Sequence, residues 1–212
     1  MNHKVSNRSI EDLNIDDFLG GERIKVIYTD PPWNNFKYWS TLALKQTGEK
    51  LKPIDNDITA KFLNTLALNY LDGFMFLEMG TKTNVEPILQ GLHNRLEFDV
   101  FYKGGGKWLP SKIYVGSTSP DYIFKKDLTG IKCSGSTLPI TCLQEVQKTS
   151  FEDSQRTSYG VGQRTSFEGG LVFDPFCGLG NTAEGAKKTG MVFYGNEFNK
   201  KRYETTLRRI ND

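Results

Sequence analysis

Short apolar runs alternate with segments of helical periodicity along most of the chain. Runs rich in β-branched and aromatic residues predict buried strands at Lys25–Thr29, Phe74–Leu77, Phe98–Tyr102, Leu171–Phe173 and Val192–Gly195. Apolar residues three and four positions apart predict helices over Ser9–Gly21, Thr59–Gly73, Val85–Leu96 and Thr182–Thr189. This alternation predicts the α/β class, with a doubly wound, mostly parallel Rossmann-like sheet and helices on both faces.

Three segments lack this periodicity. Residues 34–57 are polar and aromatic, and we expect a loop near a functional site, because long loops inside compact domains are commonly functional. Gly104-Gly105-Gly106 predicts a flexible connection, since no helix follows it. Ile113–Val115 and Asp121–Phe124 are predicted to form the two arms of a hairpin around Ser119-Pro120.

A fourth segment, residues 147–170, repeats every eight positions. The copies are Gln147–Ser154, Gln155–Gly162 and Gln163–Gly170, and each offers an amide, a cation, hydroxyl groups and an aromatic ring. Two interpretations remain open. The copies either hold a phosphate backbone and stack on bases, or they form a low-complexity insertion produced by duplication.

The composition sets broad limits. With 212 residues the chain is expected to form a single domain, and its formal charge of +2 does not by itself indicate a nucleic-acid binder. Local charge is more informative, because Lys103–Lys132 contains six lysines and Lys187–Arg209 contains seven basic residues. Three cysteines without CxxC spacing, no membrane-length apolar run and no signal-like N-terminus predict a soluble, cytoplasmic protein. Two isolated histidines predict no metal site.

Asp30-Pro31-Pro32-Trp33 directly follows a predicted central strand. The two prolines fix an extended loop at the carboxyl end of the strand, where open α/β sheets bind their ligands. In that loop Asp30 can accept one proton of a planar amine, a backbone carbonyl can accept the other, and Trp33 can stack on the ring. The four residues therefore predict a site for a flat group that carries an NH2.

A second strand end offers a matching half-site. Asp174 to Thr182 is a glycine-bearing turn between a strand and a helix, an arrangement that lets a ligand approach the backbone at the helix N-terminus. After the next strand, Glu197 can accept hydrogen bonds from both hydroxyls of a ribose, and Phe198 can cover an adenine. No Walker lysine accompanies these residues, so a nucleoside without a polyphosphate is favoured over ATP or NAD.

Taken together, the two segments resemble a known family. The order of Asp30–Trp33 before Phe176–Gly180 is similar to that of S-adenosylmethionine-dependent DNA amino-methyltransferases of the permuted beta class, in which a DPPW or DPPY segment precedes FxGxG. The tryptophan form also resembles the MT-A70 family. The resemblance implies methyl transfer from S-adenosylmethionine to the exocyclic amine of a nucleic-acid base. Aspartate at the first position favours adenine N6 over cytosine N4.

The resemblance also implies a role for individual residues. The catalytic residues would be Asp30, Pro31, Pro32 and Trp33. The cofactor would contact Asp174, Phe176, Gly178, Gly180, Asn181, Thr182, Glu197 and Phe198, together with Asp12. Nucleic acid would contact Phe36, Tyr38, Lys103, Lys107, Lys112, Arg156 and Arg164. A catalytic half at about 9–127 and a cofactor half at 171–212 would then be joined by a linker at about 128–170.

Other functions stay open at this point. The chain lacks room for a conventional target-recognition domain, so a second copy of the chain or a specificity partner could read the sequence. DNA is favoured over RNA as the nucleic-acid partner, and no membrane partner is expected. The alternatives are a methyltransferase acting on RNA or on a protein amide, and a nucleic-acid-binding subunit with little turnover of its own.

Overall fold

The computed structural model describes residues 2–32, 36–50, 55–80, 83–104, 106–156 and 169–211. Within these ranges only the backbone is described for Phe36, Tyr38, Trp39, Gln46 and residues 149–156. Trp33 and Arg164, both predicted to be functional, lie outside the described residues.

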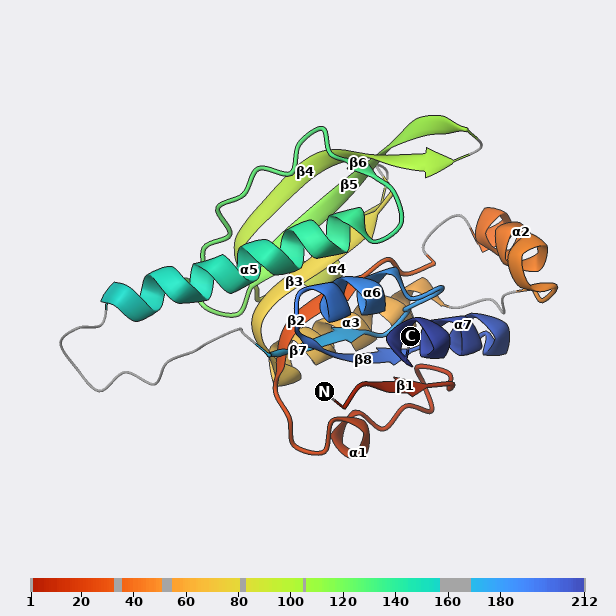
Figure 1. Cartoon of the computed structure of the whole chain (residues 1–212), viewed down its shortest axis with the longest axis horizontal. Helices are drawn as coiled ribbons and strands as arrows, with labels where there is room; N and C mark the ends of the chain where they lie inside the picture. The colour runs from red at the N-terminus through yellow and green to blue at the C-terminus, as the bar shows by residue number, and fades with distance from the viewer. Residues whose placement is uncertain are drawn as a thin grey trace.

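The described residues form one eight-stranded sheet with the order β1-β8-β7-β2-β3-β5-β4-β6 (Figure 1). The strands are β1 Lys4–Ser6, β2 Ile24–Thr29, β3 Leu71–Met79, β4 His93–Gly104, β5 Lys107–Ser117, β6 Lys132–Cys133, β7 Leu171–Asp174 and β8 Val192–Asn196. All neighbouring pairs are parallel except those that β5 makes with β3 and β4. The predicted α/β class and mostly parallel sheet are therefore confirmed.

Helices cover both faces of this sheet (Figure 1). The helices are α1 Ile15–Leu19, α2 Phe36–Thr47, α3 Asn56–Tyr70, α4 Glu86–Leu89, α5 Thr137–Arg156, α6 Asn181–Lys188 and α7 Lys200–Asn211. Buried side chains of α5, α6 and α7 share one core cluster with Val26 and Tyr28, whereas those of α1, α3 and α4 share another with Ile24 and Ile27. Because both faces are covered, the central strands β2, β3 and β7 are mostly apolar.

Several predicted elements are confirmed. The five predicted strands lie within β2, β3, β4, β7 and β8, and the predicted helix Thr182–Thr189 corresponds to α6. The helix predicted from Thr59 is α3, which begins after Asp55, whose carboxylate accepts hydrogen bonds from the backbone N–H groups of Asp57 and Ile58. It ends at Tyr70, before Gly73, which lies inside β3.

Other predicted boundaries are wrong. The loop predicted for residues 34–57 contains α2, in which Leu42, Ala43, Leu44 and Lys45 are good helix formers. The helix predicted at Val85–Leu96 is only α4, because the chain turns at Gly91 (φ +85°) and enters β4 at His93. The helix predicted over Ser9–Gly21 covers Ile15–Leu19 and ends at the left-handed Gly20.

The predicted hairpin is also wrong. Ile113–Val115 belongs to β5, whose antiparallel partners are β4 and β3, and Asp121–Phe124 is not a strand. β4 and β5 form a long hairpin, and Gly104 pairs with Lys107 across its end. Gly106, with a φ of +79°, therefore lies in the turn of this hairpin.

The segment that the sequence suggested as a linker is partly helical. α5 extends to Arg156 and buries Leu138, Cys142, Leu143 and Val146 against the sheet, so it supplies the helix that precedes β7. The first octapeptide copy has helical backbone, and residues 157–168 lie outside the described part of the chain. Among the described helices, none is both long enough and apolar enough to cross a bilayer.

Helix α3 offers a test of this packing. Leu63 is 0% exposed against the sheet, while Leu68 on the same helix is 51% exposed. We expect Leu63→Ala to lower the free energy of unfolding by about 2–5 kcal/mol, because it leaves a cavity in the core. Leu68→Ala is the matched control and should change it by less than about 0.5 kcal/mol. Urea denaturation measures both values, and equal losses would contradict the described packing.

Candidate active site

Three acidic residues stand at the carboxyl ends of adjacent strands. In β2 and β3, Thr29 pairs with Leu77, so the next residues, Asp30 and Glu78, lie beside each other. In β2 and β7, Ile27 pairs with Phe173, so Asp174 lies beside Tyr28. Side chains alternate between the two faces of a sheet, and all three carboxyls therefore point to the face covered by α5 and α6.

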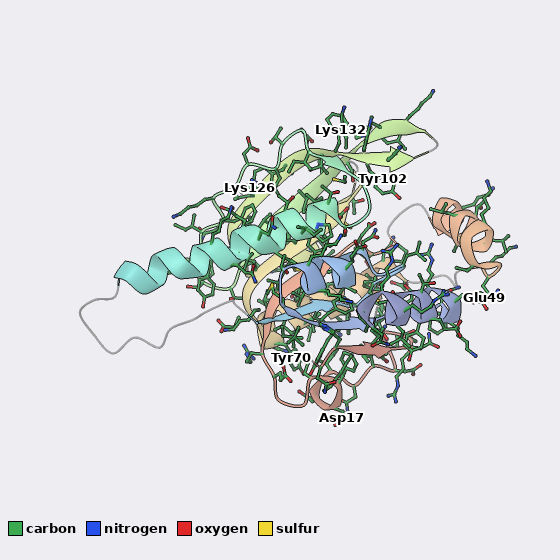
Figure 2. All side chains as sticks on the ribbon, in the orientation of Figure 1. Asp17, Glu49, Tyr70, Tyr102, Lys126 and Lys132 are labelled. Atoms are coloured by element: carbon green, nitrogen blue, oxygen red, sulfur yellow. The ribbon has the colours of Figure 1, made fainter. Side chains whose placement is uncertain are left out.

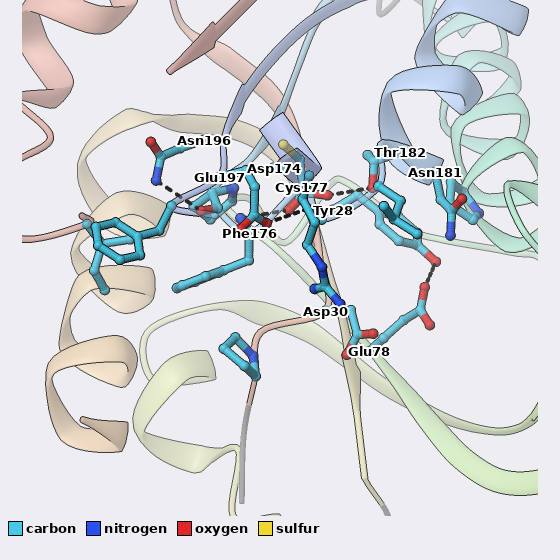
Figure 3. A pocket seen from close by; sticks show the side chains of 18 of the residues that line it. Tyr28, Asp30, Glu78, Asp174, Phe176, Cys177, Asn181, Thr182, Asn196 and Glu197 are labelled. Atoms are coloured by element: carbon cyan, nitrogen blue, oxygen red, sulfur yellow. Dashed lines mark hydrogen bonds between the residues drawn. The ribbon is translucent and has the colours of Figure 1, made fainter. Parts of the chain in front are cut away.

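These carboxyls open into a cavity of about 650 Å³ (Figure 3). This volume lies within the range of about 300–1,000 Å³ that is typical of small-molecule sites. The cavity lies where β7 and β2 meet, which is the point where the strand order reverses and where α/β sheets bind ligands. The predicted residues on its wall are Asp12, Asp30, Pro32, Asp174, Phe176, Gly178, Asn181, Thr182, Glu197 and Phe198. Pro31 and Gly180 are buried instead.

The glycine turn after β7 is held tightly against α7. Gly180 has a φ of +84°, and a Cβ atom on it would lie 3.0 Å from Thr206 Oγ1 and 3.1 Å from Thr206 Cα. The Thr206 hydroxyl donates a hydrogen bond to the carbonyl of Gly178 (3.1 Å), which has a φ of +54°. Only glycine fits at position 180, so the turn brings its backbone to the cavity wall.

Glu197 connects the end of β8 to this turn. Its Oε2 accepts a hydrogen bond from the backbone N–H of Gly178 (2.9 Å), and its Oε1 accepts one from that of Asn199 (2.8 Å). Burial raises the pKa of Glu197, while the Asn199 N–H, the Arg202 charge and the Gly178 N–H each lower it. A carboxylate oxygen accepts more than one hydrogen bond, so Glu197 can also accept from hydroxyl groups in the cavity.

Asp174 has a structural task within the same wall. It is 3% exposed and accepts hydrogen bonds from the Thr182 hydroxyl (2.6 Å) and the backbone N–H of Phe176 (3.1 Å). Burial raises the pKa of Asp174 to about 7, although the hydrogen bonds from Thr182 and Phe176 act in the opposite direction. Asp174 therefore holds the start of α6 and the glycine turn together.

Asp30 and Glu78 form a second acidic group in the cavity (Figure 3). Asp30 keeps solvent contact through the cavity, while protein atoms surround its carboxyl group on other sides. This enclosure, followed by the charges of Glu78 and Asp174, raises the pKa of Asp30 well above its usual value, and the Arg202 charge lowers it. Burial also raises the pKa of Glu78, whose Oε1 accepts a hydrogen bond from the buried Tyr28 hydroxyl.

Of the predicted nucleic-acid residues, Lys103, Lys107 and Lys112 lie on the β4–β5 hairpin. The ammonium groups of Lys103 and Lys132 lie 6.0 and 5.6 Å from the ring centroid of Trp108, and Lys107 is exposed at the turn. Lys132 is near Tyr102 at the outer end of the sheet (Figure 2).

The remaining predicted nucleic-acid residues are Lys112, whose side chain is described, and others whose side chains are not. Lys112 contacts Glu97 and lies 3.1 Å from Asp99, so its charge is already balanced. The side chains of Phe36, Tyr38 and Arg156 lie outside the description, and their roles stay predictions.

Some wall residues were missed by the sequence analysis. Tyr28, Glu78, Arg8 and Arg202 all line the cavity. Glu78 follows the apolar run Phe74–Leu77 just as Asp30 follows Lys25–Thr29, and that shared position was the available signal. Among the described residues, no group of His, Cys, Asp and Glu is arranged to hold a metal ion.

Comparisons with known proteins show similarity in structure. No protein-family model matches the chain, and no curated protein matches it in sequence. The M1.HpyAVI-SAM complex matches with a TM-score of 0.63 and 14% identity, covering 100% of both chains. TTHA0409 of Thermus thermophilus, complexed with S-adenosyl-L-methionine, gives 0.56 and 13%, covering 99% of this chain and 93% of that one.

A third solved structure extends the comparison. The cytosine-N4-specific PvuII DNA methyltransferase gives a TM-score of 0.51 and 15% identity, covering 90% of this chain and 80% of that one. At identities of only 13–15%, TM-scores of 0.51–0.63 over most of each chain show that the fold is shared.

The raised pKa of Asp174 predicts a pH-dependent stability. Between about pH 4 and pH 7 the folded chain keeps a proton on Asp174 that the unfolded chain has lost, because the folded pKa is about 7 and the ordinary value is 3.8. The free energy of unfolding therefore falls as pH rises through this window, by up to roughly 1.4 kcal/mol per pH unit from this group. Asp174→Asn removes this slope.

Urea denaturation at several pH values measures the free energy of unfolding of the parent and of Asp174→Asn, and hence how it depends on pH in each protein. The exposed Asp121 provides the control variant Asp121→Asn, which should keep the parental slope. Parallel pH profiles for the parent and Asp174→Asn would show that Asp174 is ionised throughout.

Proposed function

We propose that this chain transfers a methyl group from S-adenosylmethionine to the exocyclic amine of a nucleic-acid base, with adenine N6 in DNA as the target. The main support is that one cavity is lined by Asp30 and Pro32, which follow β2, and by the glycine turn after β7 and Glu197 after β8. These segments are distant in sequence. The first carries the residues proposed to bind the base, and the second carries those proposed to bind the cofactor. Similar folds in M1.HpyAVI and TTHA0409, both crystallised with S-adenosylmethionine, add support.

The cavity wall fits the proposed cofactor. Gly178 brings the backbone to the wall without a Cβ atom, and Asn181 opens α6 beside the glycine turn. Glu197 can accept hydrogen bonds from ribose hydroxyls, while Phe176 and Phe198 offer apolar surface to an adenine. When bound, S-adenosylmethionine supplies an electrophilic methyl group on a positively charged sulfur.

Asp30 would then orient the amine of the base. Its carboxylate and the Pro31 carbonyl each accept an amine N–H, which turns the nitrogen lone pair toward the methyl group. The lone pair forms the new N–C bond, the C–S bonding pair stays on sulfur, and the surplus amine proton passes to Asp30. Such alignment can lower the barrier by several kcal/mol. The carboxyl thus serves first as an acceptor and then as the proton's destination.

A base in a duplex must leave the stack before it can enter this cavity. The exposed Lys103 and Lys107 on the hairpin offer contacts to phosphates, and Trp108 between Lys103 and Lys132 offers a ring for stacking. The aspartate at position 30 favours adenine. The similar PvuII enzyme is specific for cytosine N4, so the methylated nucleoside has to be identified directly.

Replacing Asp30 tests the proposed chemistry. With labelled S-adenosylmethionine and separate DNA and RNA pools, we expect Asp30→Ala to lower methyl transfer by at least about 100-fold, since it removes the group that orients the amine. Asp121→Ala, a change of an exposed carboxylate outside the cavity, should retain the parental rate. Mass spectrometry of the digested nucleosides identifies the product. An unchanged rate for Asp30→Ala would contradict the proposal.

A charge change on the hairpin tests the proposed DNA contact. Lys107→Ala should weaken DNA binding and reduce the slope of log K against log salt by about 0.9, which is the value for one lost phosphate contact. Lys61→Ala removes another exposed lysine, from α3 on the face opposite α5 and α6, and should leave affinity and slope unchanged. Fluorescence anisotropy at a series of salt concentrations measures both. If the two substitutions had equal effects on affinity and slope, Lys107 would not be a specific DNA contact.

A further inference from the structure

Glu78 is a polar residue in the cavity that the proposed reaction leaves without a role. It stands beside Asp30 on the neighbouring strand, and both side chains line the same cavity (Figure 3). Its Oε1 accepts a hydrogen bond from Tyr28, whose ring is 1% exposed and packs against Phe76 with a centroid distance of 5.9 Å. The carboxyl is therefore fixed in orientation by a rigid part of the sheet.

The charges around this pair are mostly acidic. Asp174 faces it from β7, and the uncharged thiols of Cys133 and Cys142 approach from β6 and α5. The cation that acts on Asp30 comes from α7, where Arg202 also acts on Glu197. Ionising both of these adjacent carboxyls is costly, because burial raises the pKa of each and a third acid, Asp174, lies beside them, so one proton shared between Asp30 and Glu78 is favoured.

A pair of carboxyls that shares one proton presents a hydrogen-bond acceptor next to a hydrogen-bond donor. The Tyr28 hydroxyl already donates to Oε1 of Glu78, so a proton on Glu78 lies on Oε2. The edge of an adenine has the complementary pattern, because the amine at C6 donates and the neighbouring N1 accepts. Cytosine repeats the pattern with its amine at C4 and N3. The Watson–Crick edge of guanine does not, since N1, the ring nitrogen beside its amine on that edge, carries a proton.

We infer that Glu78 is a specificity-determining residue whose carboxylic acid donates a hydrogen bond to the ring nitrogen beside the amine that Asp30 accepts. This inference rests on the proposed function and deepens it. The two carboxyls would together read the amine and ring-nitrogen edge of the base, so that adenine or cytosine is accepted while guanine and thymine meet a donor facing a donor.

Base analogues test this contact in the unchanged protein. If the product is N6-methyladenine, the substrate carries 1-deazaadenine at the target position, and if it is N4-methylcytosine, it carries 3-deazacytosine. Either analogue keeps the amine and replaces the ring nitrogen by C–H. We expect kcat/KM to fall by about 10- to 100-fold with the analogue, because the Glu78 donor is left without a partner.

Two variants assign the effect to Glu78. Glu78→Ala should lose about the same factor on the natural base and should no longer distinguish the analogue. Glu78→Gln keeps a donor, now as an amide, so it should retain kcat/KM within a few-fold. Its activity should also persist to higher pH than that of the parent, because an amide does not titrate whereas the shared carboxyl proton is lost as pH rises.

The possible failures are distinguishable. Transfer to neither DNA nor RNA by the parent protein would contradict the proposed function itself. Equal kcat/KM on the natural base and its analogue would overturn only the role of Glu78, and this comparison needs no variant. A loss in Glu78→Ala that is equally large on both substrates would indicate a structural role, and calorimetric binding of S-adenosylmethionine to that variant checks that its fold is intact.

Discussion

The parallel pairing of β2 with β7 and β3 governs the rest of this structure. Its register places Tyr28 beside Asp174 and Asp30 beside Glu78, so the side chains on one face converge at one edge of the sheet. A shift by one residue would turn every carboxyl to the opposite face, where α3 packs. The apolar residues of β2, which are buried on both sides, make such a shift costly because each face fills a different core cluster. Core packing thereby fixes the geometry of the cavity.

The parts of the fold that were predictable from sequence are those with strong local signals. β2 and β7 are short, mostly apolar and closely followed by proline, and the Asp30 and Gly178 segments were located because of those boundaries. α2 was missed because aromatic and polar residues at its start conceal the helix formers that follow. The hairpin was misassigned because the pairing of β4 with β5 depends on contacts across the sheet, which local periodicity does not contain.

In the candidate site, too, residues with a local sequence signal were predicted, and relations that depend on strand order were not. Asp30, Asp174 and Glu197 were found because each is an acid that follows a buried strand, while Glu78 has the same position and was overlooked within its apolar run. Its proximity to Asp30 follows from strand order, and strand order is a nonlocal property. The hydrogen bond from the Gly178 N–H to Glu197 likewise joins residues from two strand ends, so its existence could be predicted only after the order was known.

The order of the strands also has a consequence for how the chain reaches its native state. β7 lies between β8 and β2, so Ile27 and Phe173 pair across about two thirds of the chain, and Lys4 of β1 pairs with Tyr194 of β8. Such distant contacts have a high entropic cost of loop closure and slow down folding. Until β7 arrives, one edge of β2 is open to other strands during synthesis. The cavity therefore forms only after β7 and β8, near the end of the chain, have paired with β2 and β1, near its beginning.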